Sequence, residues 1–251
     1  MAALPPSARV PNPCDMAMKP AAGCGMRGCP KCSIRASYGG LNAPRRMSGV
    51  SSLAMLMACC AMHRVTTIPA LLIGLVIIAI TAGLLYAAGR SPICPCGTVK
   101  FFDFVPKAGE DSQHIFDWYT FSHILHGLIF YFAIWLVGRG RVPFAVGILI
   151  AVVLESGWEL FENSQYIINR YQSQSIYEQY NGDSVINAVG DILTMAFGFF
   201  MASLLPALAS VALLIGIEVW MAWMIRDNLT LNVISLTHPI ASISQWQEGR
   251  K

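Results

Sequence analysis

The sequence predicts an all-α integral membrane protein, a helical bundle with about five transmembrane helices. Two observations predict this fold class. Of the 251 residues, 55% are hydrophobic and 12% are charged, whereas a soluble domain carries about 25% charged residues. Several apolar stretches also reach the roughly 20 residues that a helix needs to cross a bilayer. The net charge is only +3 and no basic stripe is interleaved with aromatics, so we expect no nucleic acid as a partner.

The first 62 residues differ from the rest of the chain. Residues 1–46 are rich in Pro, Gly, Ala and Cys and show no helical period. Cys29-Pro-Lys-Cys32 has the spacing of a zinc knuckle, but Cys14 and Cys24 do not form a second close pair. Residues 47–62 are apolar but too short to span. We therefore interpret 1–62 as a disordered extension or as the product of a start codon assigned too early, and 63–251 as the membrane domain.

Five stretches of the membrane domain are predicted to span the bilayer. The first is longer than the apolar core of a signal peptide, which has about 7 to 15 residues, and it ends at Arg90. A polar loop that contains Cys94-Pro-Cys96 separates it from the second, and the basic turn Gly138–Arg141 separates the second from the third. The predicted spans are about 65–89, 118–137, 142–162, 184–204 and 207–225.

The lysines and arginines favour an N-terminus in the cytoplasm. Eight of them precede the first span and two lie in the turn at residues 139–141, against seven on the opposite side. Basic residues accumulate on the cytoplasmic side of membrane proteins. Under this topology Cys94 and Cys96 face an oxidising compartment, as a labile disulfide, a metal contact or plain thiols.

The third span ends in three carboxylates, Glu155, Glu159 and Glu162, at positions i, i+4 and i+7. This spacing places them on one face of a helix. A charged side chain at the centre of a membrane helix costs about 2.5 to 3.5 kcal/mol on insertion scales. We therefore expect this face to line the bundle interior or a water-filled cavity.

The other spans carry their polar residues at the same membrane face, because the second and fourth begin where the third and fifth end. A polar cavity that opens to one side, the outer side, accounts for this pattern. Its carboxylates outnumber the nearby cations, so arginine pairs, protons or a bound cation must compensate them. The remaining candidate residues at this face are His123, His126, Asn163, Arg170, Asp183, Asn187, Asp191, Glu218 and Arg226.

Simpler structural roles compete with this interpretation. Asp183 has the position of an N-cap for the fourth span, the glutamates can pair locally, and the histidines can bond between helices. Gly182, Gly190 and Gly198 indicate close helix approach. Histidine and carboxylate suit several divalent metals, but the paired Glu-x-x-His motif of a di-iron bundle is absent. The metal, any cofactor and the oligomeric state stay undetermined.

Several motifs occur together in the order of the chain: Ser91-Pro-Ile-Cys-Pro-Cys-Gly97, Asp117-Trp-Tyr-Thr-Phe-Ser-His123, Trp158-Glu159, Glu162-Asn163, Tyr180-Asn-Gly-Asp-Ser184 and Arg226-Asp-Asn-Leu-Thr-Leu-Asn232. They resemble those of an uncharacterised, UPF-type family of multi-pass bacterial inner-membrane proteins, a domain of unknown function, over about residues 92–246. More distantly, an acid in one span and an arginine in the next loop, followed by Asp183, Asn187, Gly190 and Gly198, are similar to the closing signature of the VanZ-like family. This second resemblance implies the cell envelope and lipid-linked molecules, but no particular reaction.

The first functional hypothesis is an inner-membrane protein whose outward polar cavity binds a lipid head group or a cell-envelope intermediate. If it is also an enzyme, a carboxylate or His123 transfers the proton. The catalytic candidates are Glu155, Glu159, Glu162, His123 and Asp183. The ligand-binding candidates are His126, Asn163, Arg170, Asn187, Asp191, Glu218 and Arg226. The alternatives are a proton- or cation-coupled transporter, against which the absence of a visible inverted repeat argues, and a non-enzymatic assembly factor of the membrane.

Overall fold

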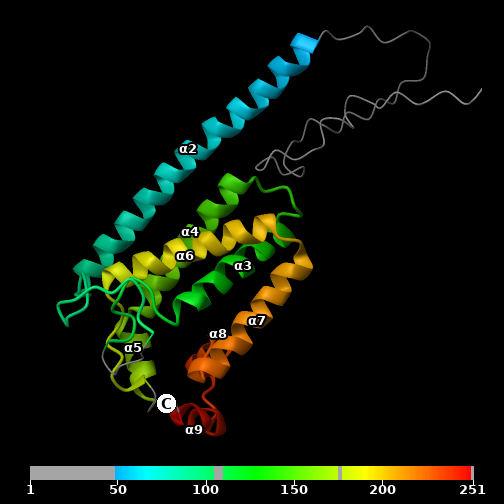
Figure 1. Ribbon diagram of the computed structural model, residues 1–251. Helices are drawn as coiled ribbons and strands as arrows, with labels where there is room; N and C mark the ends of the chain where they lie inside the picture. The colour runs from blue at the N-terminus through cyan, green and yellow to red at the C-terminus, as the bar shows by residue number, and fades with distance from the viewer. Residues whose placement is uncertain (1–48, 105–109, 175–176, 250–251) are drawn as a thin grey trace, which may run out of the picture. The chain divides into compact units, whose positions relative to one another are not determined.

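A computed structural model describes residues 49–104, 110–174 and 177–249 of the chain (Figure 1). These residues form eight helices and no strand, apart from an isolated bridge between Phe102 and Phe116. Five of the helices include stretches long and apolar enough to cross a membrane, which confirms the predicted fold class. The helices are α2 (Gly49–Ala87), α3 (Thr120–Val137), α4 (Phe144–Glu162), α5 (Gln165–Gln172), α6 (Val185–Leu204), α7 (Ala207–Ile225), α8 (Leu229–Thr237) and α9 (Ala241–Glu248).

The membrane-spanning helices agree closely with the predicted spans, except at the start of the first. The apolar stretch of α2 covers Ile68–Ala87, but the helix itself begins at Gly49. The helix thus extends into residues 1–62, the segment interpreted above as disordered or mis-assigned. Residues 49–67 are rich in helix formers such as Ala, Met and Leu, which explains this extension. Residues 1–48, including the cysteines considered for zinc, lie outside the described residues.

The bundle is built around the contact between α3 and α6, the most extensive one between its helices. Glycines allow the two backbones to touch. A Cβ atom on Gly127 would lie 2.2 Å from the carbonyl oxygen of Met195, and one on Gly198 would lie 2.3 Å from that of Ile124. Such close approach is how membrane helices gain packing energy, because lipid tails provide no hydrophobic driving force between them. The prediction of close approach at Gly198 is confirmed.

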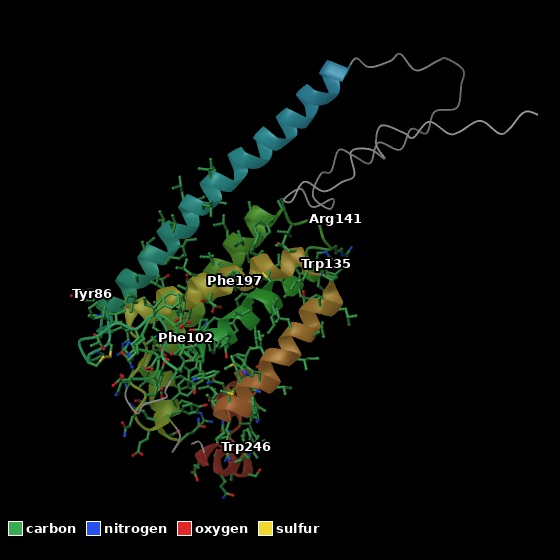
Figure 2. The ribbon with its side chains drawn as sticks, in the orientation of Figure 1. Tyr86, Phe102, Trp135, Arg141, Phe197 and Trp246 are labelled. Atoms are coloured by element: carbon green, nitrogen blue, oxygen red, sulfur yellow. A yellow bond between two sulfur atoms is a disulfide. The ribbon has the colours of Figure 1, made fainter. Side chains whose placement is uncertain are left out.

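Short helices and loops gather at one end of the bundle, where α3 and α6 begin and α4 and α7 end. We call it the polar end. Figure 1 shows α5, α8 and α9 there, and α5 packs on α8. Figure 2 shows Phe102 and Trp246 at this end, with Trp135 and Arg141 at the other. The outer faces of the long helices expose apolar side chains such as Val153, as lipid contact requires.

The loop before α3 closes the N-terminus of α6. The backbone amides of Val185 and Ile186 donate to the carbonyl oxygens of Ser91 and Pro92 at 2.8 and 3.2 Å. The Ser184 side chain accepts from the Asn187 amide and is the N-cap of α6. These bonds satisfy orphan amides of the first helical turn. They also fix the loop over the polar end.

Candidate functional site

Two histidines of α3 and two glutamates of α4 form a buried cluster at the polar end, together with one aspartate of α6. His123 Nδ1 lies 2.5 Å from Oε1 of Glu155, and His126 Nδ1 lies 3.0 Å from both oxygens of the same carboxylate. His123 also lies 3.6 Å from Oε1 of Glu159, through Nδ1, and 3.7 Å from Oδ2 of Asp191, through Nε2. A single imidazole therefore faces three carboxylates.

Hydrogen bonds from the start of α3 hold Asp191 in this cluster. The Thr120 hydroxyl donates to Oδ1 of Asp191 at 3.0 Å and accepts from the backbone amide of Asp117. Asp117 in turn accepts from the backbone amides of Ser112 and Tyr119 at 2.9 and 2.7 Å. Burial nevertheless raises the pKa of the Asp117 carboxyl, against the effect of these bonds.

Glu159 differs from the other acids of the cluster. Its side chain is fully buried, and neither carboxylate oxygen has a hydrogen-bond partner among the described residues. A buried polar group without a partner pays its full desolvation cost, and more so if it is charged. The carboxylate therefore needs either a proton or a cation.

A cavity of about 390 Å³ opens beside this cluster. It lies between the polar ends of the helices and the loops that cover them. His123, His126 and Asp191 reach its wall, whereas Glu155 and Glu159 lie behind them. The other lining residues are Gly89, Arg90, Ser91, Pro95, Asp111, Ser112, Gln113, Tyr119, Ser122, Trp158, Glu162, Tyr171, Tyr177, Glu178, Gln179, Tyr180, Asn181, Gly182, Asp183, Leu229 and Asn232.

Tyrosines of the segment between α4 and α6 form one side of the cavity. The Tyr171 hydroxyl lies 3.1 Å from Oε1 of Glu162 and 2.6 Å from Oδ1 of Asn232, and the Tyr177 hydroxyl donates to Asp227. Burial raises the pKa of both phenols well above the usual range. They therefore stay protonated hydrogen-bond donors at neutral pH, and these contacts already engage their hydroxyl groups.

Asp183 is a cavity residue and not the predicted N-cap of the fourth span, since Ser184 has that role. Its carboxyl accepts from Asn163 Nδ2 at 2.7 Å and from the Tyr180 hydroxyl at 2.9 Å. The Asp183 backbone amide donates back to Oδ1 of Asn163. Burial raises the pKa of Asp183, while the two side-chain donors oppose this shift. The N-cap alternative is wrong because α6 begins at Val185, which makes Ser184 the residue before its first turn.

The other candidates lie outside the cavity wall. Asn187 donates to the carbonyl oxygen of His114, and its own side-chain oxygen is buried with no hydrogen-bond partner in the part of the chain that the structure describes. Glu218 accepts from the backbone amides of Leu229 and Thr230, at the start of α8. Arg170 donates to the carbonyl oxygen of Leu236, and Arg226 to that of Trp246. The arginines therefore tie the terminal helices to the bundle instead of compensating the glutamates.

Arg90 is the cavity residue that the sequence did not reveal as part of the site. It follows α2, and its Nη1 lies 2.5 Å from the carbonyl oxygen of Asn181, while its buried Nε has no hydrogen-bond partner within residues 49–104, 110–174 and 177–249. The sequence identified it only as the end of the first span. The nearby motif beginning at Ser91 was the one signal in the sequence that could have indicated a role for Arg90.

Asp227 is a second residue that the sequence analysis missed. It is fully buried and accepts from Tyr119 and Gln247.

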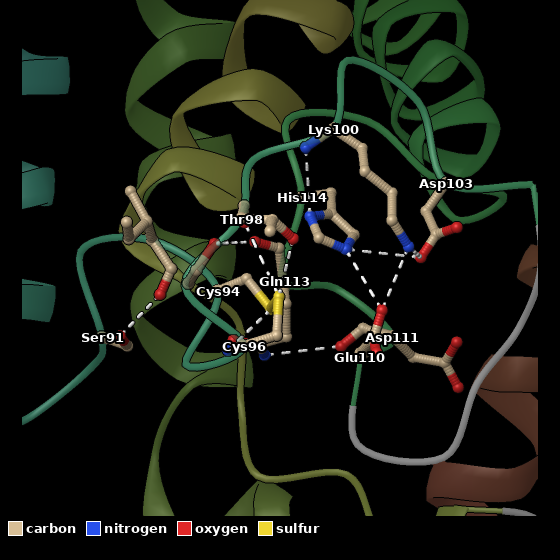
Figure 3. The surroundings of a disulfide bond; sticks show 12 residues. Ser91, Cys94, Cys96, Thr98, Lys100, Asp103, Glu110, Asp111, Gln113 and His114 are labelled. Carbon is tan, nitrogen blue, oxygen red and sulfur yellow. Dashed lines mark hydrogen bonds and ion pairs between the residues drawn. A yellow bond between two sulfur atoms is a disulfide. The ribbon is translucent and has the colours of Figure 1, made fainter.

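A second cluster of ionisable groups lies in the loop between α2 and α3 (Figure 3). Lys100 Nζ bridges Asp103 and Glu110 at 3.1 and 3.0 Å. The buried His114 Nε2 lies 3.5 and 3.6 Å from the same two carboxylates. His114 and these acids have the ligand chemistry for a metal, but the Lys100 ammonium already compensates the acids.

The structure joins Cys94 and Cys96 in a disulfide beside this cluster (Figure 3). The sequence had left three states open for this pair, a disulfide, a metal contact and plain thiols, and the structure has the disulfide. Cys94 is buried and Cys96 is exposed. The disulfide lies in the loop that caps α6, so it belongs to the cover of the polar end.

Comparison with known proteins places the chain in a family. The family model described as "Protein of unknown function (DUF2585)" matches residues 85–249. The UPF0314 protein of Paracoccus denitrificans is 50% identical over 159 residues, which are 63% of this chain and 82% of that protein. A UPF0314 protein of Agrobacterium fabrum is 45% identical over 166 residues, 66% of this chain and 83% of the relative. In Novosphingobium aromaticivorans, a UPF0314 protein is 44% identical over 182 residues, 70% of this chain and 89% of its own length.

These matches confirm the resemblance to an uncharacterised UPF-type family. No solved structure matches the chain significantly. The similarity to the VanZ-like family stays a prediction, because neither the matching family model nor these relatives carry that name. The chain belongs to the DUF2585 family of proteins of unknown function.

Proposed function

We propose that this protein lies in the bacterial inner membrane and binds the polar head group of a membrane or cell-envelope lipid in the cavity at its polar end. The observation that carries the proposal is the place of the cavity. It opens where the spans begin and end, which is the level at which we expect the head groups of a bilayer. Its volume of about 390 Å³ falls in the range of about 300 to 1,000 Å³ that is typical of small-molecule sites.

The wall of the cavity favours a head group that donates hydrogen bonds. The described lining residues include five carboxylates, one arginine, Arg90, and the histidines His123 and His126. The hydroxyl groups of Tyr171, Tyr177 and Tyr180 already bond to protein acceptors. Acidic groups therefore outnumber basic ones in the described part of the wall, and carboxylate oxygens match hydroxyl or amine groups of a ligand. The five acids are Asp111, Glu162, Glu178, Asp183 and Asp191.

Binding accounts for the arrangement better than transport does. Further from the polar end, buried apolar residues fill the interior between α4 and α6. In the part of the chain that the structure describes, the polar groups are thus confined to one end, whereas a transporter needs a site that opens alternately to both sides. The members of this apolar core are Ala151, Val152, Ile192, Met195 and Phe199.

Two features support a cavity that faces outward and an N-terminus in the cytoplasm. The excess of basic residues before the first span favours this orientation. The disulfide between Cys94 and Cys96 lies in the loop over the polar end, and disulfides persist in oxidising compartments such as the bacterial periplasm. The cavity would then meet lipids of the outer leaflet.

Native mass spectrometry of protein purified from its own bacterial membrane tests the proposal. The wild-type chain is expected to retain one lipid whose head group carries hydroxyl or amine groups. Asp183→Asn and Glu162→Gln should each weaken retention about tenfold or more, since a hydrogen bond to a charged group contributes about 1.5 to 3 kcal/mol. Glu248→Gln, at an exposed acid of α9 outside the cavity, is the matched control. Equal lipid retention in all four proteins would contradict the proposal.

A further inference from the structure

We propose that His123, Glu159 and Asp191 bind a divalent metal ion at the base of the cavity. Each residue offers one ligand atom, and the three atoms lie within 4.8 Å of one another. Ligand atoms of a tetrahedral zinc ion are about 3.4 Å apart, because each bond is about 2.1 Å long. Side-chain movements of about an ångström would therefore complete the site.

The unpartnered carboxylate of Glu159 is the second observation for a cation. All three residues are buried, and both oxygens of Glu159 lack a hydrogen-bond partner among the described residues. A buried charge without compensation costs several kcal/mol. The loop cluster provides the contrast: there the Lys100 ammonium lies between Asp103 and Glu110, whereas His123 is the basic side chain that the described residues place within ion-pair distance of Glu159.

The charges of the cluster also leave room for an ion. Glu155, Glu159 and Asp191 surround His123, which carries one positive charge at most. His126 contacts only Glu155 of these three acids. A divalent ion between Glu159 and Asp191 would compensate both carboxylates and leave Glu155 to the histidines.

Glu155 occupies the position of a supporting carboxylate. A metal-binding histidine usually donates its second ring N–H to a carboxylate, which fixes the orientation of the ring. Glu155 lies 2.5 Å from Nδ1 of His123. The other ring nitrogen, Nε2, faces Asp191. The ring is thus held with Nε2 towards Asp191, as a metal ligand requires, while Oε1 of Glu159 lies 3.6 Å from Nδ1 and has to shift towards the ion.

The ligand set favours Zn²⁺, Mn²⁺ or Fe²⁺ over Ca²⁺ and Mg²⁺. Imidazole is a ligand of transition metals, whereas Ca²⁺ and Mg²⁺ prefer sites made only of oxygen. His123 and Asp191 both line the cavity, which gives the ion a route from the polar end. The site does not require a bound head group, so it can exist whether or not the cavity binds lipid.

Metal content of the purified full chain, measured by mass spectrometry in detergent without added lipid, tests the site. After EDTA treatment and addition of Zn²⁺ or Mn²⁺ alone, the wild type is expected to bind about one ion per chain and to resist thermal unfolding better. Glu159→Gln and Asp191→Asn should each bind the ion at least tenfold more weakly. His114→Gln removes the loop ligand, and Glu248→Gln an unrelated acid, so both should behave as the wild type.

Two results would overturn the site. One is a wild-type chain that takes up no stoichiometric ion and gains no thermal stability from Zn²⁺ or Mn²⁺, which would leave a proton to neutralise Glu159. The other is loss of the ion in His114→Gln with retention in Glu159→Gln, which would move the site to the loop. If the cluster variants do not fold, the visible absorption spectrum of the Co²⁺-loaded wild type tests the proposal instead. Bands of Co²⁺ bound by nitrogen and oxygen ligands would support it, and the spectrum of aqueous Co²⁺ would contradict it.

Discussion

Replacing Glu155 with alanine is expected to lower the free energy of unfolding by about 3 to 5 kcal/mol, the usual cost of removing one partner of a buried ion pair. One hydrogen bond between membrane helices contributes about 0.6 kcal/mol on average and at most about 1.7. We expect the cost of a broken ion pair, not that of one hydrogen bond, because this single carboxylate contacts both His123 and His126. Its loss leaves the buried His123 and the half-buried His126 without this acceptor.

Unfolding of the purified protein in mixed micelles, with a rising fraction of dodecyl sulfate, measures this change. Glu155→Gln keeps the shape and one acceptor oxygen, so it should destabilise less than Glu155→Ala. Glu178→Ala, at an exposed acid on the cavity rim, should change the free energy by about 0.5 kcal/mol or less. If Glu155→Ala is as stable as Glu178→Ala, the contacts with the two histidines do not hold the bundle together.

Replacing Gly127 with alanine is expected to destabilise the bundle by about 1 to 3 kcal/mol, the cost of overpacking a filled interior. The new Cβ would lie 2.2 Å from the carbonyl oxygen of Met195 and 2.4 Å from the amide nitrogen of Phe199. Backbone atoms cannot turn aside as a side chain can. The helices α3 and α6 would have to separate.

The same substitution at Gly216 of α7 is a matched control. A Cβ there meets no atom within 4 Å, and alanine is favoured over glycine inside a helix by up to about 1 kcal/mol. The two variants should therefore shift the dodecyl sulfate midpoint in opposite directions. A Gly127→Ala protein at least as stable as the wild type would show that α3 and α6 are not in backbone contact.

The sequence predicted the spans well because each depends on a local property, the length of an apolar run. It placed the third at about residues 142–162, and α4 covers Phe144–Glu162. It also located the polar face, since the count of spans alone puts His123, Glu159 and Asp191 at one end. Their mutual contacts could not be predicted, because they depend on how closely α3, α4 and α6 approach one another.

The cover of the cavity could not be predicted for a different reason. Residues 163–184 and the tail after Arg226 carry no clear period in the sequence, yet they form α5, α8 and α9. These helices are stabilised by bonds between distant segments, such as the one from Gln247 to Asp227 at 3.0 Å. Arg170 and Arg226 were expected near the glutamates on the basis of charge, and they bond to backbone carbonyls instead.

A cryo-electron microscopy map of the protein purified from its native membrane tests the central claim most directly. We expect density for a lipid head group inside the cavity, within hydrogen-bond distance of Asp183 and Glu162 and close to His126. The acyl chains should leave between the spans towards the bilayer. A map in which the cavity holds only water, with lipid confined to the apolar outer faces of the helices, would contradict the claim.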